Sequence, residues 1–211
     1  MLKTLKNILI YLFFPVIFVL LFTNDINSKL YISLMFLSYI LLGIYFYIIY
    51  KDDLLNDFKT FNKRYFKSIF TYFFIGFCLS TLSNLLINTF IIPNGISNNE
   101  LSNIDYLLKN KFLYSIMLCI LIPIIEEVVF RLELKKKYKN KYLFIIISSS
   151  IFSILHLLSN THLIELIYFI PYFIIGYTFS SLYYKTNNIY TNILTHMLHN
   201  SVIVIYYLLF L

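Results

Sequence analysis

The chain has 211 residues, of which 60% are hydrophobic and 13% are charged. With a mean hydropathy of +0.78 and several long uncharged runs, this composition excludes a soluble globular domain and indicates an integral membrane protein. The formal net charge of +7 does not indicate a nucleic-acid partner, because the basic residues stand in short segments between the apolar runs, as orientation signals do. Cys78 and Cys119 lie inside apolar runs, so we expect neither a disulfide framework nor a cysteine metal site.

Taken in chain order, the apolar runs predict an all-α, polytopic bundle of about seven transmembrane helices. The first run follows two lysines, as in a signal peptide. No small-residue cleavage site follows it, so we interpret it as an uncleaved span. The predicted spans are Ile8 to Phe22, Leu30 to Tyr50, Phe66 to Ile92, Phe112 to Phe130, Tyr142 to Leu158, Leu163 to Tyr184 and Ile189 to Leu211.

Two connecting segments are long enough to need an interpretation of their own. Lys51 to Arg64 is charged, with its apolar residues roughly on one face, which predicts a helix lying at the membrane interface. A Pro-Asn-Gly sequence at 93–95 predicts a turn, and the polar stretch from there to Lys111 is interpreted as a loop. An eighth membrane segment would require a re-entrant piece between Lys51 and Ile92.

Lysine and arginine are distributed unevenly between the two sides of the predicted spans. If the N-terminus is cytoplasmic, the cytoplasmic segments hold 14 of the 17 basic residues, and only Lys29, Lys109 and Lys111 fall on the other side. This bias predicts a multi-pass protein of the cell membrane, with a cytoplasmic N-terminus and an extracytoplasmic C-terminus. The densest basic stretch, Lys135 to Lys141, is also expected to contact anionic lipid.

Two adjacent glutamates, Glu126 and Glu127, lie near the end of the fourth predicted span. A carboxylate at the centre of a membrane costs roughly 2.5 to 3.5 kcal/mol on insertion scales, so an acid there indicates a functional site. On a helix, Glu127 and Arg131 share a face, with the acid N-terminal to the base, which is the favourable order for an ion pair. Glu126 points about 100° away and needs a partner from another helix.

Two later spans carry polar residues at helical spacing. Phe152 and His156 are four residues apart in one span, and His196 and Asn200 are four apart in another. Each pair projects from one helix face, and a bundle can bring such faces to a common cavity. These groups suit the hydrolysis of an amide or similar bond, in which a carboxylate or imidazole takes a proton from water and an imidazole or amide stabilises the oxyanion.

A metal-dependent alternative uses some of the same residues. Glu126, His156 and His196 would bind zinc and leave one position open for water. The chain has no HExxH sequence, so such a site would be assembled from separate helices. We expect no cofactor, with zinc as the alternative.

Together, the three motifs resemble the CAAX-protease and bacteriocin-processing family of intramembrane proteases, also called the Abi family. The family pattern is EExxxR, then FxxxH, then HxxxN or HxxxD on separate transmembrane helices. Here it reads Glu126 to Arg131, Phe152 to His156 and His196 to Asn200. The resemblance covers about Phe112 to Leu211 and implies an all-helical bundle with a cavity open toward the cytoplasm.

The resemblance also implies roles for the site residues. Glu126 with His156 would activate water, and His196 with Asn200 would hold the oxyanion. Supporting positions would be Glu127, Arg131 and Phe152.

Helix geometry raises one difficulty for this arrangement. If the fifth span starts at Tyr142, His156 lies ~21 Å along its helix, whereas Glu126 lies only ~8 Å from Arg131. The two residues then meet only if the fifth helix extends into the cytoplasm, as we expect, or tilts strongly.

The sequence thus predicts two parts, with N-terminal helices and loops in residues 1–111 and the catalytic helical core in residues 112–211. The predicted function is an intramembrane endopeptidase that cleaves a peptide or membrane-associated substrate, in bacterial bacteriocin self-immunity or peptide maturation. Its predicted partners are that substrate and membrane lipids. The alternative is a non-catalytic immunity or scaffold protein that binds a toxin or its receptor. A transporter or channel is disfavoured, because the chain shows no internal repeat.

Overall fold

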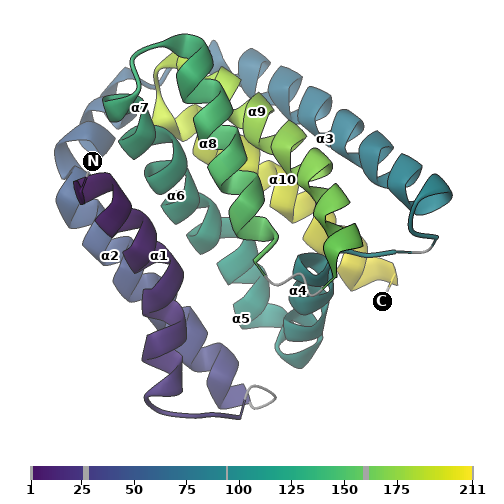
Figure 1. The fold of residues 1–211 in the computed structure, drawn as a ribbon. Coiled ribbons are helices and arrows are strands. Elements are labelled where there is room, and N and C mark those ends of the chain that lie inside the picture. The colour runs from purple at the N-terminus through teal and green to yellow at the C-terminus, as the bar shows by residue number, and fades with distance from the viewer. Residues whose placement is uncertain (1, 26–28, 94, 159–161, 211) are drawn as a thin grey trace.

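A computed structural model describes residues 2–25, 29–93, 95–158 and 162–210, and in this part of the chain helices joined by short connections form the fold, without strands (Figure 1). It has six helices that are long and apolar enough to cross a membrane, and a shorter apolar helix of 16 residues. Large apolar side chains cover much of the outer surface, as lipid contact requires. The predicted all-α polytopic bundle is confirmed.

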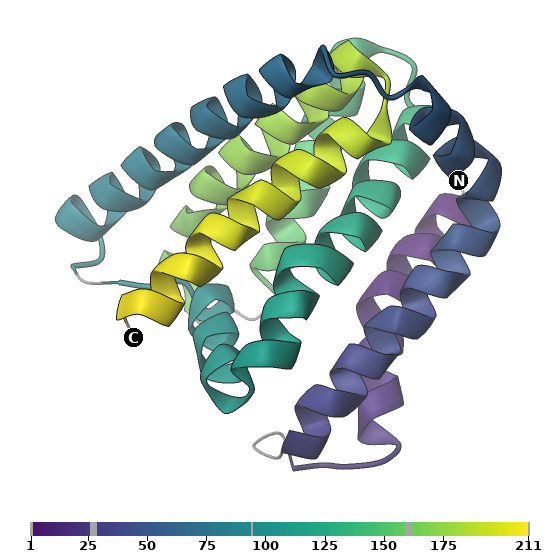
Figure 2. The same ribbon diagram turned by 180° about the vertical axis from the view of Figure 1, so that it is seen from behind.

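The first two helices form an antiparallel pair along one side of the bundle (Figures 1 and 2). They are α1 (Leu2–Leu20) and α2 (Lys29–Thr60). Backbone angles at Tyr50 (φ −112°, ψ 17°) kink α2 without ending it. The segment predicted as a separate interfacial helix is therefore the continuation of α2, and it stops at Thr60 rather than at Arg64.

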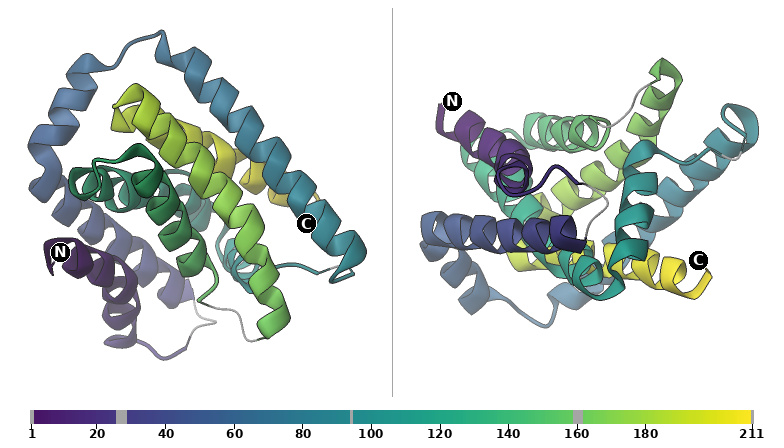
Figure 3. Two further views of the ribbon diagram at one scale, coloured as in Figure 1. Left: turned by 45° about the horizontal axis from the view of Figure 1, so that its top comes forward. Right: turned by 90° about the horizontal axis from the view of Figure 1, so that it is seen from below.

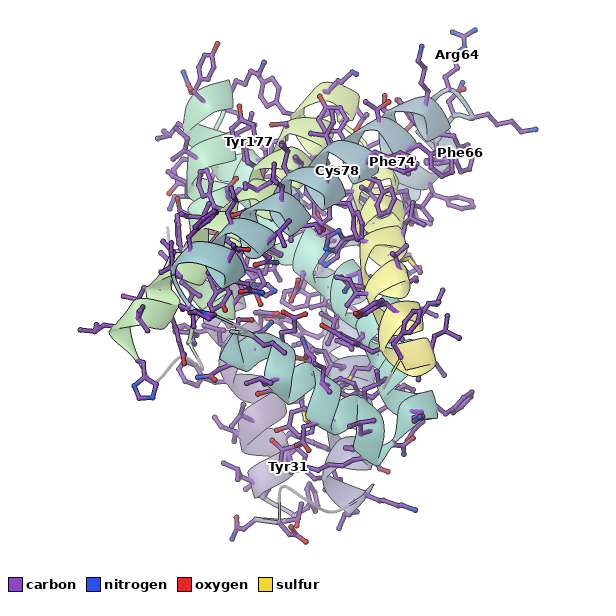
Figure 4. All side chains as sticks on the ribbon, turned by 90° about the vertical axis from the view of Figure 1, so that its right-hand side faces the viewer. Tyr31, Arg64, Phe66, Phe74, Cys78 and Tyr177 are labelled. Atoms are coloured by element: carbon purple, nitrogen blue, oxygen red, sulfur yellow. The ribbon has the colours of Figure 1, made fainter. Side chains whose placement is uncertain are left out.

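The third helix, α3 (Tyr65–Phe90), is one uninterrupted helix of 26 residues. Within the described residues, this continuity excludes the re-entrant eighth segment. Figure 4 shows Phe66 and Phe74 on the outward face of α3, and both are exposed. That face is apolar enough to contact lipid.

The stretch interpreted as a loop contains the helix α4 (Asn98–Lys109), so that interpretation was wrong. Ser97 caps the helix, because its hydroxyl accepts a hydrogen bond from the backbone N–H of Glu100. Glu100 also places a negative charge in the first turn, which favours the helix dipole. These capping signals favour a helix directly after the predicted turn. Asn94, in the middle of that turn, lies outside the described residues.

The fourth span is one helical run with two π-helical turns. It comprises α5 (Lys111–Ile116), the π turn η1 (Met117–Leu121), α6 (Ile122–Glu127), the π turn η2 (Val128–Glu133) and α7 (Leu134–Lys137). Pro123 is the second residue after η1 and has no backbone N–H to donate, which favours an altered register in the turn before it. The run extends seven residues beyond the predicted end at Phe130.

The remaining helices complete the bundle around this central run. They are α8 (Lys141–His156), a 3₁₀ turn η3 (Leu163–Tyr168), α9 (Phe169–Thr186) and α10 (Ile189–Phe210). Figure 3 shows α9 between α8 and α3, and Figure 2 shows α10 in the foreground, beside the central run. Side chains of α1 and α10 contact the glutamates of α6.

The basic residues mark the two ends of the bundle. At the lysine-rich end, the α2–α3, α7–α8 and α9–α10 connections come together: Lys136 pairs with Asp53, and Lys135 donates to Asn187. At the lysine-poor end lie α4 and the start of α5, with Lys109 and Lys111 (Figure 1). The lysine-rich end and the lysine-poor end are thus opposite ends of the bundle.

Candidate active site

Glu126 and Glu127 lie on α6, between the two π turns, and both are almost fully buried, at 3% and 0% exposure. The side chain of Arg131 is also fully buried, and its Nε lies 3.4 Å from Oε2 of Glu127. The i, i+4 spacing therefore brings this acid and base within ion-pair distance. A buried charge without such a partner would be strongly destabilising.

Aromatic rings and a serine hold the guanidinium of Arg131. Its central carbon lies 5.1 Å from the ring centre of Phe152 and 6.0 Å from that of Phe179, within the range of cation–π attraction. Its Nη1 donates to Ser148 Oγ at 3.2 Å, and Ser148 in turn donates to the carbonyl of Phe130. Phe152 thus packs against the charge behind the site.

His196 connects the two glutamates. Its Nδ1 lies 2.9 Å from Oε1 of Glu127, and Asn192 donates to Oε2 of the same carboxylate at 3.2 Å. An ionised carboxylate only accepts hydrogen bonds, so Nδ1 of His196 carries the proton of this bond. The other ring nitrogen, Nε2, lies 3.9 Å from Oε2 of Glu126.

Glu126 has a different environment from its neighbour. Its Oε1 accepts a hydrogen bond of 2.5 Å from the hydroxyl of Tyr11 on α1. Its Oε2 is buried and has no hydrogen-bond partner in the described part of the chain. This oxygen is therefore free to accept a hydrogen bond from a molecule that enters the site.

His156 ends α8 and lies between two rings. Its Nδ1 is 2.8 Å from the carbonyl oxygen of Phe152, and its ring centre is 4.3 Å from that of Phe152 and 4.8 Å from that of Tyr172. The imidazole within ion-pair distance of Glu126 is thus that of His196. Spacing along one helix cannot predict which imidazole of another helix comes nearest.

Asn200 reaches a carbonyl that the central run leaves without its usual donor. In the π register, the N–H of residue i+5 bonds to the carbonyl of residue i, and the position five residues after Leu118 is Pro123. Asn200 instead donates to the carbonyl of Leu118 at 2.9 Å. Asn200 therefore has a structural role in the π turn, in addition to the predicted role at the oxyanion.

A cavity of about 570 Å³ lies against these groups. The imidazoles of His156, His196 and His199 line it, whereas Glu127 and Arg131 do not. The predicted residues that line this cavity are Glu126, Phe152, His156, His196 and Asn200. The structure thus brings the three motifs together, and the catalytic role of each residue stays a prediction.

Sequence reasoning missed Tyr11, because the first three spans were interpreted only as generic membrane helices. A signal was present: Thr4, Asn7 and Tyr11 recur at helical spacing near the start of the chain and form a polar stripe. Thr4 donates to Glu133 at 2.7 Å, and Asn7 donates to Tyr50 at 2.8 Å. The stripe therefore docks α1 against α2 and the central run.

The donor set for zinc is only partly assembled. In the described part of the chain, no group of three His, Cys, Asp or Glu side chains is arranged to hold a metal ion. Of the expected set, Glu126 and His196 are close, whereas Nδ1 of His156 bonds to a backbone carbonyl. A zinc ion would need His156 to bind through its other nitrogen, Nε2.

Comparison with known proteins gives one match. A family model described as type II CAAX prenyl endopeptidase Rce1-like matches residues 108–202, which include all three motifs. Neither the search of curated proteins nor that of solved structures found a match. By this match, residues 108–202 are similar to the CAAX prenyl endopeptidase family.

Proposed function

We propose that the protein is an intramembrane endopeptidase in which Glu126 activates a water molecule. The observation that carries this proposal is the pair of unshared acceptors at the cavity wall, Glu126 Oε2 and His196 Nε2, which lie 3.9 Å apart. This spacing is too long for a direct hydrogen bond, and a water molecule that donates to both can bridge it.

The reaction follows from these positions. The water oxygen attacks the peptide carbonyl carbon, while Glu126 takes one of its protons. The carbonyl oxygen becomes an oxyanion, for which the second amide N–H of Asn200 is the donor we propose. The C–N bond then breaks, and the leaving amine receives a proton from Glu126.

Glu127, Arg131 and Asn192 act on His196 rather than on substrate. The Glu127 carboxylate keeps the proton of His196 on Nδ1, so Nε2 faces the water as an acceptor. Arg131 offsets the charge of Glu127, which has no contact with the cavity. This arrangement assigns His196 to positioning the water, in place of the oxyanion role implied by the resemblance.

The matched family model is named for cleavage of prenylated proteins. For this chain we propose a peptide or membrane-associated substrate, in bacteriocin self-immunity or peptide maturation in a bacterium. The alternative is a binding protein that keeps the fold and confers immunity without catalysis. A variant without the Glu126 carboxylate distinguishes the endopeptidase from the binding protein.

Glu126→Gln keeps the shape of the side chain but cannot take the proton. We expect peptide cleavage by the purified protein in detergent to fall by about 10²- to 10⁴-fold, the usual effect of losing a general base. The matched control is Glu133→Gln, which changes another buried carboxylate outside the cavity and should retain cleavage. Full cleavage by a folded Glu126→Gln protein would exclude the mechanism, and retained cellular immunity in that variant would favour the binding protein.

A chelator tests the zinc alternative on the wild-type protein. If Glu126 activates water without a metal, cleavage should be unchanged after treatment with 1,10-phenanthroline. Loss of cleavage that added zinc restores would instead make Glu126, His156 and His196 the metal ligands.

A further inference from the structure

The cavity occupies only one half of the bundle. Along the central run, its lining residues extend from Tyr114 to Glu126, and none follows Glu126. On α10, which runs the opposite way, the lining begins at His196 and continues to Tyr207. On both helices the lining lies between the catalytic level and the lysine-poor end.

The lysine-rich side of the site is closed. Each of the seven residues at 128–134 is at most 5% exposed. Beside them, Thr4 donates to Glu133, Asn7 donates to Tyr50, and the Tyr50 hydroxyl bonds to Glu133. This buried, hydrogen-bonded layer joins α1, α2 and the central run on the lysine-rich side of the glutamates, and the described cavity does not extend into it.

The lysine-poor end has a polar rim instead. One face of α4 lines the cavity with Asn99, Glu100 and Asn103, which are half-buried. Asn99 donates to Tyr172 at 3.1 Å, so the rim contacts the same ring that packs on His156. An amide-rich rim can bond to the backbone of a peptide, because amides both donate and accept.

The depth and charge of the cavity restrict what can reach the site. Tyr114 and Glu126 are twelve residues apart on one helical run, about 18 Å at 1.5 Å per residue, so about five to six residues of extended chain are needed to cover this depth. The described lining contains the carboxylates of Glu100 and Glu126 and neither lysine nor arginine. An acidic segment would therefore be repelled.

We infer that the substrate is an extended peptide segment without acidic side chains, which reaches Glu126 from the lysine-poor end, past α4. That the peptide is a substrate rests on the proposed function, whereas the direction from which it reaches the site rests on the cavity alone.

Single cysteines test the direction of access without any need for catalysis. In a Cys78→Ser, Cys119→Ser protein, Asn84→Cys lines the cavity and Lys139→Cys lies exposed at the lysine-rich end. In sealed vesicles, a membrane-impermeant thiol reagent should label these two cysteines from opposite sides of the membrane. Labelling of both from the same side would overturn the inference.

A bulky label at the rim tests the path itself. In the same background, Asn103→Cys faces the cavity, and Ser102→Cys is its exposed neighbour on α4. After labelling of the folded protein with a large maleimide, cleavage of a fluorogenic peptide of about ten residues should fall at least about tenfold for Asn103→Cys and stay unchanged for Ser102→Cys. Equal activity of the two labelled proteins would contradict the path.

The peptide itself tests the charge preference. Two fluorogenic peptides are identical except for one residue in the part that extends toward the α4 rim, which is Lys in one and Glu in the other. The lysine peptide should have the higher kcat/KM. A higher kcat/KM for the glutamate peptide would contradict the inferred charge preference. If the wild-type protein cleaves neither probe, the proposed function fails, and the vesicle labelling still decides the direction of access.

Discussion

Glu126 and Glu127 are adjacent in the chain but meet different surroundings. Glu127 faces Arg131, His196 and Asn192, so its charge is balanced and its oxygens have partners. Among the described residues, Glu126 has a single donor and one oxygen without a partner. Pairs of carboxylates with such contrasting surroundings commonly divide the work of a site between orientation and proton transfer.

At the residue scale, Tyr11 is the least expected member of the site, since it stands outside the region that the family model matches. Its hydroxyl fixes the orientation of the Glu126 carboxylate, and a hydrogen bond to a charged group contributes about 1.5 to 3 kcal/mol. Tyr11→Phe should therefore lower kcat about tenfold or more and leave KM nearly unchanged, as steady-state kinetics would measure.

The control for this variant is Tyr39→Phe, which also alters a tyrosine that lines the cavity. It should leave kcat unchanged, because Tyr39 has no hydrogen bond to Glu126. If both variants lose activity equally, the effect belongs to the cavity wall, and the positioning role of Tyr11 is wrong.

At the element scale, the close packing of α8 and α9 supports the site from behind. A Cβ on Gly176 would lie 3.0 Å from Ser149 Cα, 3.2 Å from its carbonyl oxygen and 3.3 Å from a ring carbon of Phe152. Small residues allow such approach between membrane helices. Any displacement of α8 would move Phe152 and, with it, the packing around Arg131.

Gly176→Ala should therefore destabilise the protein by roughly 1 to 3 kcal/mol, as overpacking of a tight contact does, and should lower activity as well. Gly43→Ala is the matched control, because the nearest atom to its added Cβ, in Ile125, is 4.0 Å away. Thermal unfolding in detergent would compare them. An unchanged melting temperature for Gly176→Ala would show that α8 and α9 can separate at little cost.

The elements show why part of the fold was predictable from the sequence. Long apolar runs predict membrane helices well, because a backbone in lipid must satisfy its own hydrogen bonds. The errors fell where local signals compete: a kink at Tyr50 that does not end α2, and a capped α4 after a turn sequence. Asn200, from another helix, donates to a carbonyl of the π turn before Pro123, and no local pattern reveals that contact.

For the whole molecule, the sequence placed three motifs on separate helices and predicted their convergence, which the cavity shows. It did not predict how they pair, because pairing depends on helix rotation and register. The sequence also produced two conflicting expectations about which end of the bundle faces the cytoplasm. The charge bias puts the lysine-rich end in the cytoplasm, whereas the resemblance implies a cavity open to the cytoplasm, and the cavity lies toward the lysine-poor end.

The membrane topology decides between these two expectations. We expect the charge bias to prevail, because 14 of the 17 basic residues belong to the lysine-rich end and such residues resist translocation. A reporter inserted between Lys137 and Lys141 should therefore be active in the cytoplasm, and one fused to the C-terminus should be active outside it. The site would then be reached from the extracytoplasmic side. The reverse reporter pattern would refute this orientation and place the mouth of the cavity in the cytoplasm, where a peptide could reach Glu126 before export.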